Sequence, residues 1–96
     1  MSNPENGLIV VLWEAKARPG REDDMKAFMT SAVTASRHDR GCIDYEAHEV
    51  EGQRGTFIIY ERWVSRDALD DHLNAPRMQA LVPLLLEMME GSIEAG

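Results

Sequence analysis

The sequence has little of several features that define common classes of protein. Its single cysteine, Cys42, cannot form an internal disulfide. No stretch approaches the ~18–20 consecutive apolar residues that span a bilayer. Residues 1–7 also lack the positive region and apolar stretch of a secretion signal. These absences indicate a cytoplasmic protein that has no membrane partner.

Positive charge is also scarce. Lys and Arg number 10 against 17 Asp and Glu, which gives a formal net charge of -7 at pH 7. A nucleic-acid-binding domain needs a clustered excess of Lys and Arg to neutralise phosphates. The charge balance therefore argues against nucleic acid and anionic membrane surfaces as partners.

The common cofactor and metal motifs are absent. The chain contains no G-x-G-x-x-G, no P-loop, no C-x-x-C and no H-E-x-x-H. Its histidines, His38, His48 and His72, lack the spacing of metal ligands. The sequence therefore gives no sign of a cofactor, and we expect no dedicated metal site.

What the sequence does contain is clear hydrophobic patterning. Short apolar runs predict strands, and apolar residues at i, i+3, i+4 and i+7 predict helices. The predicted elements are a strand over 8–17, a helix from Glu22 to a stop at Gly41, strands over 42–50 and 56–64, a helix capped by Ser65 and ended by Asn74, and a helix from Pro76 to Gly91 in which Pro83 marks a kink or a new first turn. Residues 92–96 remain for a last strand.

This order, β-α-β-β-α(-β), predicts an α+β fold with a ferredoxin-like antiparallel sheet. We expect one domain over residues 8–96, after a flexible N-terminal arm over residues 1–7. The first strand is apolar on both faces, with Leu8, Val10 and Leu12 on one and Ile9, Val11 and Trp13 on the other. Because the helices of so short a chain can cover only one face, we expect a homodimer whose sheets pack face to face and enclose apolar pockets.

Four short motifs lie where these predicted elements begin or end. They are Pro19-Gly20 after the first strand, Gly41-Cys42-Ile43-Asp44-Tyr45 at the second, Tyr60-Glu61-Arg62-Trp63 at the end of the third, and His72 nine residues later. In this order the chain resembles, over residues 8–89, the antibiotic biosynthesis monooxygenase superfamily, and most closely its quinol monooxygenase subgroup. The resemblance implies a dimeric α+β barrel that oxygenates a small phenol or quinol with O2 and without a cofactor.

Such chemistry needs a group that favours the substrate anion, which gives an electron to O2 in a dry cavity. His72 is the candidate base, because imidazole takes and returns a proton near neutral pH. Glu61 and Trp63 are two residues apart on a strand and share a face with Phe57 and Ile59. We expect Trp63 to contact the aromatic substrate, Glu61 to orient it or a base, and Phe57 and Ile59 to line the pocket.

Three further residues complete the candidate substrate-binding set. Tyr45 can donate its hydroxyl to a quinol oxygen. His48 lies on the face opposite Tyr45, counting by two from Cys42, and can form a wet pocket wall or face solvent. Asn74 stands at a helix end, as a site residue or a cap. Structural roles are also open for the catalytic candidates. These are Trp63 as core, Glu61 paired with Arg18 or with Arg62 of the partner subunit, and His72 as a cap on a backbone carbonyl or a support for the end of the third strand.

Other functions fit the same fold. One alternative is a non-catalytic dimer that binds a small aromatic ligand, and another is an isomerase of a small carbonyl compound that uses the same histidine and carboxylate. Haem breakdown is disfavoured, because relatives with that activity also use an asparagine on the first strand, which residues 8–17 lack. Trp13 would also crowd that region.

Overall fold

The computed structural model describes residues 7–91. Within them the elements are β1 (Ile9–Lys16), α1 (Glu22–Ser36), β2 (Cys42–Glu49), β3 (Thr56–Trp63), α2 (Arg66–Leu73) and α3 (Pro76–Met88). This confirms the predicted order of strands and helices. The predicted arm, apart from Gly7, and the predicted last strand over 92–96 lie outside the described residues.

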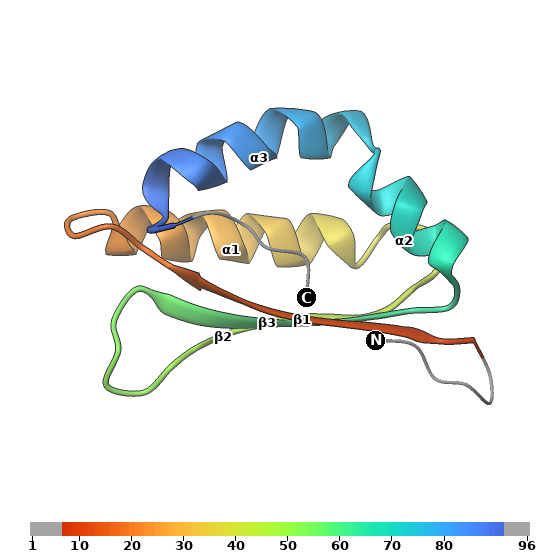
Figure 1. Cartoon of the computed structure of the whole chain (residues 1–96), viewed down its shortest axis with the longest axis horizontal. Helices are drawn as coiled ribbons and strands as arrows, with labels where there is room; N and C mark the ends of the chain where they lie inside the picture. The colour runs from red at the N-terminus through yellow and green to blue at the C-terminus, as the bar shows by residue number, and fades with distance from the viewer. Residues whose placement is uncertain (1–6, 92–96) are drawn as a thin grey trace.

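The strands form an antiparallel sheet in the order β1-β3-β2, and the helices cover one of its faces (Figure 1). The central strand, β3, pairs with both neighbours along its length. Glu61 lies opposite Val11 of β1 and opposite Tyr45 of β2. Residues directly opposite one another point to the same side of a sheet, so three strands contribute to one patch beneath the helices.

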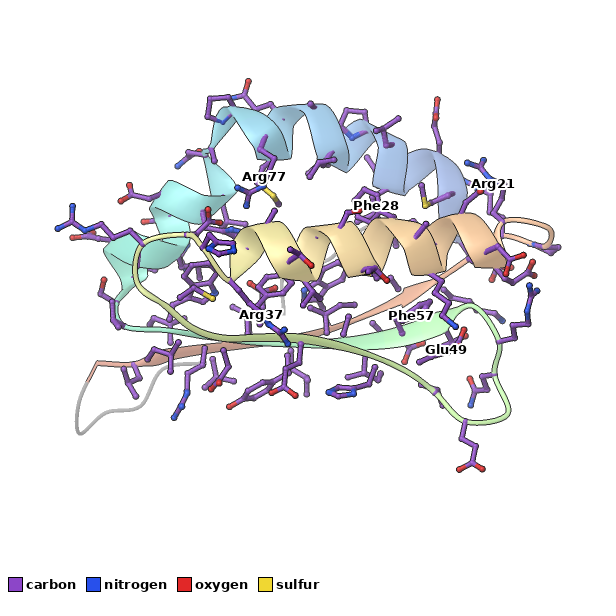
Figure 2. The ribbon with its side chains drawn as sticks, turned by 180° about the vertical axis from the view of Figure 1, so that it is seen from behind. Arg21, Phe28, Arg37, Glu49, Phe57 and Arg77 are labelled. Carbon is purple, nitrogen blue, oxygen red and sulfur yellow. The ribbon has the colours of Figure 1, made fainter. Side chains whose placement is uncertain are left out.

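The two faces of the sheet differ in their surroundings. On the helix-covered face, the β3 side chains Phe57, Ile59, Glu61 and Trp63 are buried. The opposite face, here called the open sheet face, consists of Val10, Leu12 and Glu14 of β1, Asp44, Glu46 and His48 of β2, and Ile58, Tyr60 and Arg62 of β3. No helix of the described chain covers it (Figure 2).

The helix boundaries agree in part with the predicted ones. Ser65 caps α2 as predicted, its hydroxyl accepting a hydrogen bond from the Ala68 N–H at 3.1 Å. α3 runs from Pro76 through Pro83 without a break. It ends at Met88, before the predicted stop at Gly91, because Met89 is extended and forms an antiparallel bridge with Ala17 beside β1. No helix in residues 7–91 is long and apolar enough to cross a bilayer.

The end of α1 was predicted too late. The helix ends at Ser36, and residues 37–41 form a turn that leads into β2. Gly41 does have the predicted left-handed backbone, with φ +83°, but it sits at the end of this turn and not at the helix end. There its carbonyl accepts a hydrogen bond from the Val64 N–H at 2.9 Å, which ties the turn to the residue after β3.

Gly41 also sets how closely this turn approaches α2. A Cβ at Gly41 would lie 2.5 Å from the Ala68 Cβ and 2.9 Å from Val64 Cγ2, whereas one at Gly52 (φ +77°) would meet nothing within 4 Å. We expect Gly41→Ala to lower the free energy of unfolding by about 1–2 kcal/mol more than Gly52→Ala, because only the first adds a clash to the strained φ. Urea unfolding of both variants measures this, and equal losses would contradict the close approach.

Candidate functional site

A cluster of three aromatic rings from β2, β3 and α2 lies between the sheet and the helices. The rings of Trp63 and His72 are 4.6 Å apart, centroid to centroid, with an interplanar angle of 36°. The Tyr45 ring lies 5.8 Å from His72 and 6.5 Å from Trp63, which it meets edge-on. All three side chains are buried. The structure therefore brings together three of the residues that the sequence singled out.

Glu61 is buried beside this cluster, with 4% of its surface exposed. The Trp13 indole N–H donates to Oε2 of its carboxylate at 2.7 Å, and the Trp63 indole N–H donates to Oε1 at 3.0 Å. Within residues 7–91 no arginine pairs with Glu61, and Arg18 donates instead to the Glu87 carbonyl at 3.1 Å. Both carboxylate oxygens are thus used to fix an indole, one on β1 and one on β3.

His72 has a carboxylate partner that the sequence did not suggest. Its Nδ1 lies 2.7 Å from Oδ2 of Asp39, in the turn before β2. Arg77, in the first turn of α3, donates to both oxygens of Asp39, from Nη1 at 3.1 Å and from Nη2 at 2.7 Å. The Arg77 hydrogen bonds, followed by that of His72, lower the pKa of Asp39 in spite of its partial burial. Asp39 is therefore ionised at neutral pH.

A small cavity of about 30 Å3 lies between α1, α3 and the sheet. Its lining is mostly apolar and consists of Trp13, Phe28, Met29, Ala32, Ser36, Tyr45, Met78, Leu81, Val82 and Leu85. This volume has room for about one or two water molecules. Two of the lining residues contact the buried polar cluster: Trp13 donates a hydrogen bond to Glu61, and the Tyr45 ring meets the Trp63 ring edge-on.

Tyr45 is held in its neutral form at this wall. Burial, followed by the nearby Glu61 charge, raises the pKa of the Tyr45 hydroxyl well above its ordinary value. At neutral pH the hydroxyl is therefore uncharged, and it forms a hydrogen bond with the side chain of Ser36, which also lines the cavity. A neutral phenol in an apolar wall can stabilise an oxyanion of a bound molecule by donating to it.

Some predicted site residues lie elsewhere. Ile59 is completely buried under the helices, and Phe57 lines a different hollow of about 420 Å3 between α1 and β2, near Arg37 and Glu49 (Figure 2). Asn74 is exposed at the C-cap of α2, which agrees with the capping alternative. Neither Phe57 nor Ile59 is among the residues that line the small cavity, and their expected contact with a substrate stays a prediction.

His48 is also separated from the aromatic cluster. It lies on the open sheet face with 70% of its side chain exposed, and its Nε2 is 3.0 Å from Oε1 of Glu46. Counting by two predicts that Cys42 lies on the same face as His48, but in the structure it lies on the other face. A bulge between Cys42 and Asp44 places Cys42 opposite Trp63 under the helices. Burial raises the pKa of its thiol, which stays protonated and weakly nucleophilic.

Sequence reasoning did not assign roles to Trp13, Asp39 and Arg77. Trp13 could have been found, because it alternates with Val11 and Ala15 on the face that becomes buried. Asp39 and Arg77 lie in a turn and a helix start, where no periodic pattern marks a residue. Within residues 7–91 no group of three or more His, Cys, Asp and Glu side chains could hold a metal ion.

Comparison with known proteins places this architecture in a family. The family described as "Antibiotic biosynthesis monooxygenase" matches residues 8–84. "Uncharacterized protein sll1783" of Synechocystis is 32% identical over 74 residues, which cover 77% of this chain and 50% of that protein. "Putative monooxygenase Rv0793" of Mycobacterium tuberculosis is 29% identical over 68 residues, covering 71% and 66%. The chain thus spans half to about two thirds of the length of these two relatives.

Other relatives match over nearly their whole length. "Putative monooxygenase YcnE" of Bacillus subtilis is 24% identical over 87 residues, which cover 91% of this chain and 92% of that protein. The solved structure of Rv0793 matches with a TM-score of 0.83 at 24% identity, over 93% of this chain and 90% of that one. A conserved protein from Methanosarcina mazei Go1 matches with a TM-score of 0.85 at 21% identity, over 95% and 90%.

The two solved structures confirm the ferredoxin-like fold. The family match covers most of the chain and contains Trp13, Tyr45, Glu61, Trp63 and His72. The chain therefore belongs to the antibiotic biosynthesis monooxygenase family.

Proposed function

We propose that the protein is a monooxygenase that oxidises a small phenol or quinol with O2 and needs no cofactor. The observation that supports this most directly is the apolar cavity whose wall carries the neutral Tyr45 hydroxyl and the Trp13 indole. Behind that wall, Glu61 and His72 supply a carboxylate and an imidazole in the core. These are the groups needed to bind an aromatic ring and move a proton in a dry site.

The proposed reaction can be written for a hydroquinone. The ring and O2 give a hydroxyquinone and one water, so that one oxygen atom joins a ring carbon and the other leaves as water. The substrate supplies all four electrons. Loss of a phenolic proton makes the ring electron-rich enough to give the first electron to O2. In our proposal His72 takes this proton, and the Tyr45 hydroxyl donates a hydrogen bond to the resulting phenolate oxygen.

The substrate must enlarge the cavity before this chemistry occurs. A ring of hydroquinone size needs several times the space of one or two water molecules. The outer wall consists of Met78, Leu81, Val82 and Leu85 of α3, which lies over α1 (Figure 1). We propose that these side chains move outward when a ring binds, and that the widened cavity extends past Tyr45 toward His72.

Oxygen uptake by metal-stripped protein, measured with a panel of hydroquinones, tests the proposal. We expect saturable uptake above the uncatalysed rate, with 18O from labelled O2 appearing in the product and in water. Tyr45→Phe should reduce kcat by about 10–100-fold, because it removes one donor to the phenolate. Tyr60→Phe is the matched control, since Tyr60 is the other tyrosine of the chain and lies on the open sheet face; its kcat should stay within about two-fold of the wild type.

Three results would contradict the proposal. These are uptake no faster than background with every hydroquinone, saturable binding without turnover, and conversion of the ligand that continues without O2. The second would favour a ligand-binding protein and the third an isomerase. Equal kcat values for Tyr45→Phe and Tyr60→Phe would show that the Tyr45 hydroxyl does not contribute to the reaction.

We also propose that the protein is a homodimer that buries the open sheet face. This face presents the apolar side chains of Leu12, Ile58 and Tyr60 together. It also carries the hydrogen-bonded pair of Arg62 and Asp44, whose Nε–Oδ2 distance is 2.8 Å. A surface that holds an apolar centre and charges of both signs can be complementary to a second copy of itself across a two-fold axis.

A further inference from the structure

Asp39, His72 and Arg77 form a hydrogen-bonded chain that joins three separate elements. Asp39 lies in the turn between α1 and β2, His72 lies in α2 and Arg77 lies in the first turn of α3. Figure 2 shows Arg77 at the end of α3 that adjoins α2. The His72 side chain is 1% exposed, whereas those of Asp39 and Arg77 are 20% and 32% exposed. The chain of contacts therefore runs from the surface to a buried imidazole.

The hydrogen bonds decide which nitrogen of His72 carries the proton. An ionised carboxylate can only accept hydrogen bonds, so Nδ1, at 2.7 Å from Oδ2, must be the donor. In the neutral imidazole the lone pair is then on Nε2, which lies on the side of the ring away from Asp39. The hydrogen bond described for the imidazole within residues 7–91 is the one between Nδ1 and Asp39. In this tautomer Nε2 has the lone pair that can accept a proton.

Arg77 fixes the carboxylate itself. Its two Nη groups hold both oxygens of Asp39, so the carboxylate cannot rotate away from His72 without breaking a bidentate ion pair. The hydrogen bonds to Asp39 raise the pKa of the Arg77 guanidinium above its already high ordinary value, so it is charged at neutral pH and keeps Asp39 in the acceptor form. Asp39 thus fixes the orientation of the His72 ring, and Arg77 fixes the orientation of the Asp39 carboxylate.

We propose that Asp39 and Arg77 are positioning residues that hold His72 in the Nδ1–H tautomer, with Nε2 as the proton acceptor of the oxidation. The inference has two parts: the tautomer of His72, and the catalytic role of Nε2 as proton acceptor. Only the second part, its catalytic half, rests on the proposed function. The tautomer is a property of the resting protein and can be measured without any substrate, so the two parts can be tested separately.

The first experiment is a long-range 1H–15N NMR correlation on wild-type protein labelled with 15N-histidine at neutral pH. We expect the His72 ring to show a protonated Nδ1 and an unprotonated Nε2. The ring of His38, which is exposed in the turn after α1 and lies outside the open sheet face, serves as the internal reference for a histidine that exchanges freely with water. A His72 ring with the proton on Nε2 would overturn the proposal whatever the activity of the protein.

The second experiment compares two aspartate variants. Asp39→Ala removes the acceptor, so the Nδ1–H signature should disappear and kcat in the hydroquinone assay should fall by about 10–100-fold. KM should change by less than about three-fold, because Asp39 does not line the cavity. Asp70→Ala is the matched control, since Asp70 lies on the same helix as His72 but pairs with the exposed Arg66 at 3.0 Å; its spectrum and kcat should match the wild type.

The outcomes separate the two proposals. Loss of the Nδ1–H signature in Asp39→Ala without any loss of kcat would overturn the positioning role while leaving the monooxygenase intact. A wild-type protein with the expected tautomer but no oxygen uptake would overturn the proposed function and, with it, the catalytic half of this inference. Asp39→Glu provides a rescue test, because a longer carboxylate that again reaches Nδ1 should restore part of both the signature and kcat. Failure to restore either, in a folded variant, would count against a carboxylate-specific role.

Discussion

Replacing Glu61 with glutamine should lower the free energy of unfolding by about 2–4 kcal/mol, because a buried carboxylate that accepts two indole N–H groups becomes a group with only one accepting atom. The Trp13 and Trp63 indoles donate to different oxygens of Glu61, at 2.7 and 3.0 Å. Whichever way the glutamine amide turns, its NH2 faces an indole N–H and leaves a buried donor without an acceptor. Urea unfolding followed by circular dichroism measures the loss.

Glu87→Gln is the control for this substitution. Glu87 is exposed on α3, so the same chemical change should alter the free energy of unfolding by less than about 0.5 kcal/mol. If Glu61→Gln were no more destabilising than Glu87→Gln, the two indole hydrogen bonds would not matter for folding.

A double-mutant cycle with Trp13→Phe tests the pairing itself. In the double variant the amide oxygen can accept from Trp63 while its NH2 faces a ring that has no N–H. The double variant should therefore be less destabilised than the sum of the single changes, by about 1–2 kcal/mol. A coupling near zero would show that the cost of Glu61→Gln comes from somewhere else.

Part of this site could be predicted from the sequence because a strand repeats every two residues. Glu61 and Trp63 share a face of the sheet at any register. The apolar residues Phe57 and Ile59 lie on the same face, so the burial of this face could be predicted as well. The sequence could not show that Tyr45 lies opposite Glu61 or that Trp13 reaches its second oxygen. Those contacts depend on the register between strands, which is set by packing between distant segments.

Irregular backbone accounts for most of the remaining differences between the predicted and the observed site. The bulge between Cys42 and Asp44 moves Cys42 to the other face, and one extra residue is not visible in a pattern of period two. Asp39 and Arg77 lie at a turn and a helix start, 38 positions apart in the sequence. Only the folded chain brings them to His72, and nothing in their local sequence distinguishes them from solvated surface charges.

The site depends on the fold through two separate supports. Glu61 fixes the indoles from within the sheet, and Asp39 with Arg77 fixes the imidazole from the surface side. Trp63 connects the two supports. Its indole N–H donates to Glu61, and its ring centroid lies 4.6 Å from that of His72. A substitution at Glu61 or at Asp39 should therefore alter the packing of the rings in contact with Trp63. The effects of the two substitutions on the free energy of unfolding should not be additive.

Replacing Leu12 with glutamate should weaken the proposed homodimer by at least ~10³-fold in Kd, or about 4 kcal/mol. Leu12 lies on β1 in the open sheet face, opposite Tyr60 on β3, and is 53% exposed in the single chain. In a dimer that buries this face, each copy would have to bury an unpaired carboxylate at an apolar position. Sedimentation velocity over nanomolar to micromolar concentrations measures the change.

The control is Leu84→Glu on α3. Leu84 is 49% exposed, so the two substitutions remove the same apolar side chain from nearly the same degree of exposure and add the same charge. A wild-type protein that is monomeric at micromolar concentration would contradict the homodimer, and so would equal dissociation by the two variants. Because both variants raise the negative charge of an already acidic chain equally, a difference between them can come only from where the carboxylate is placed, and dissociation by Leu12→Glu alone would identify the open sheet face as the surface buried between two copies.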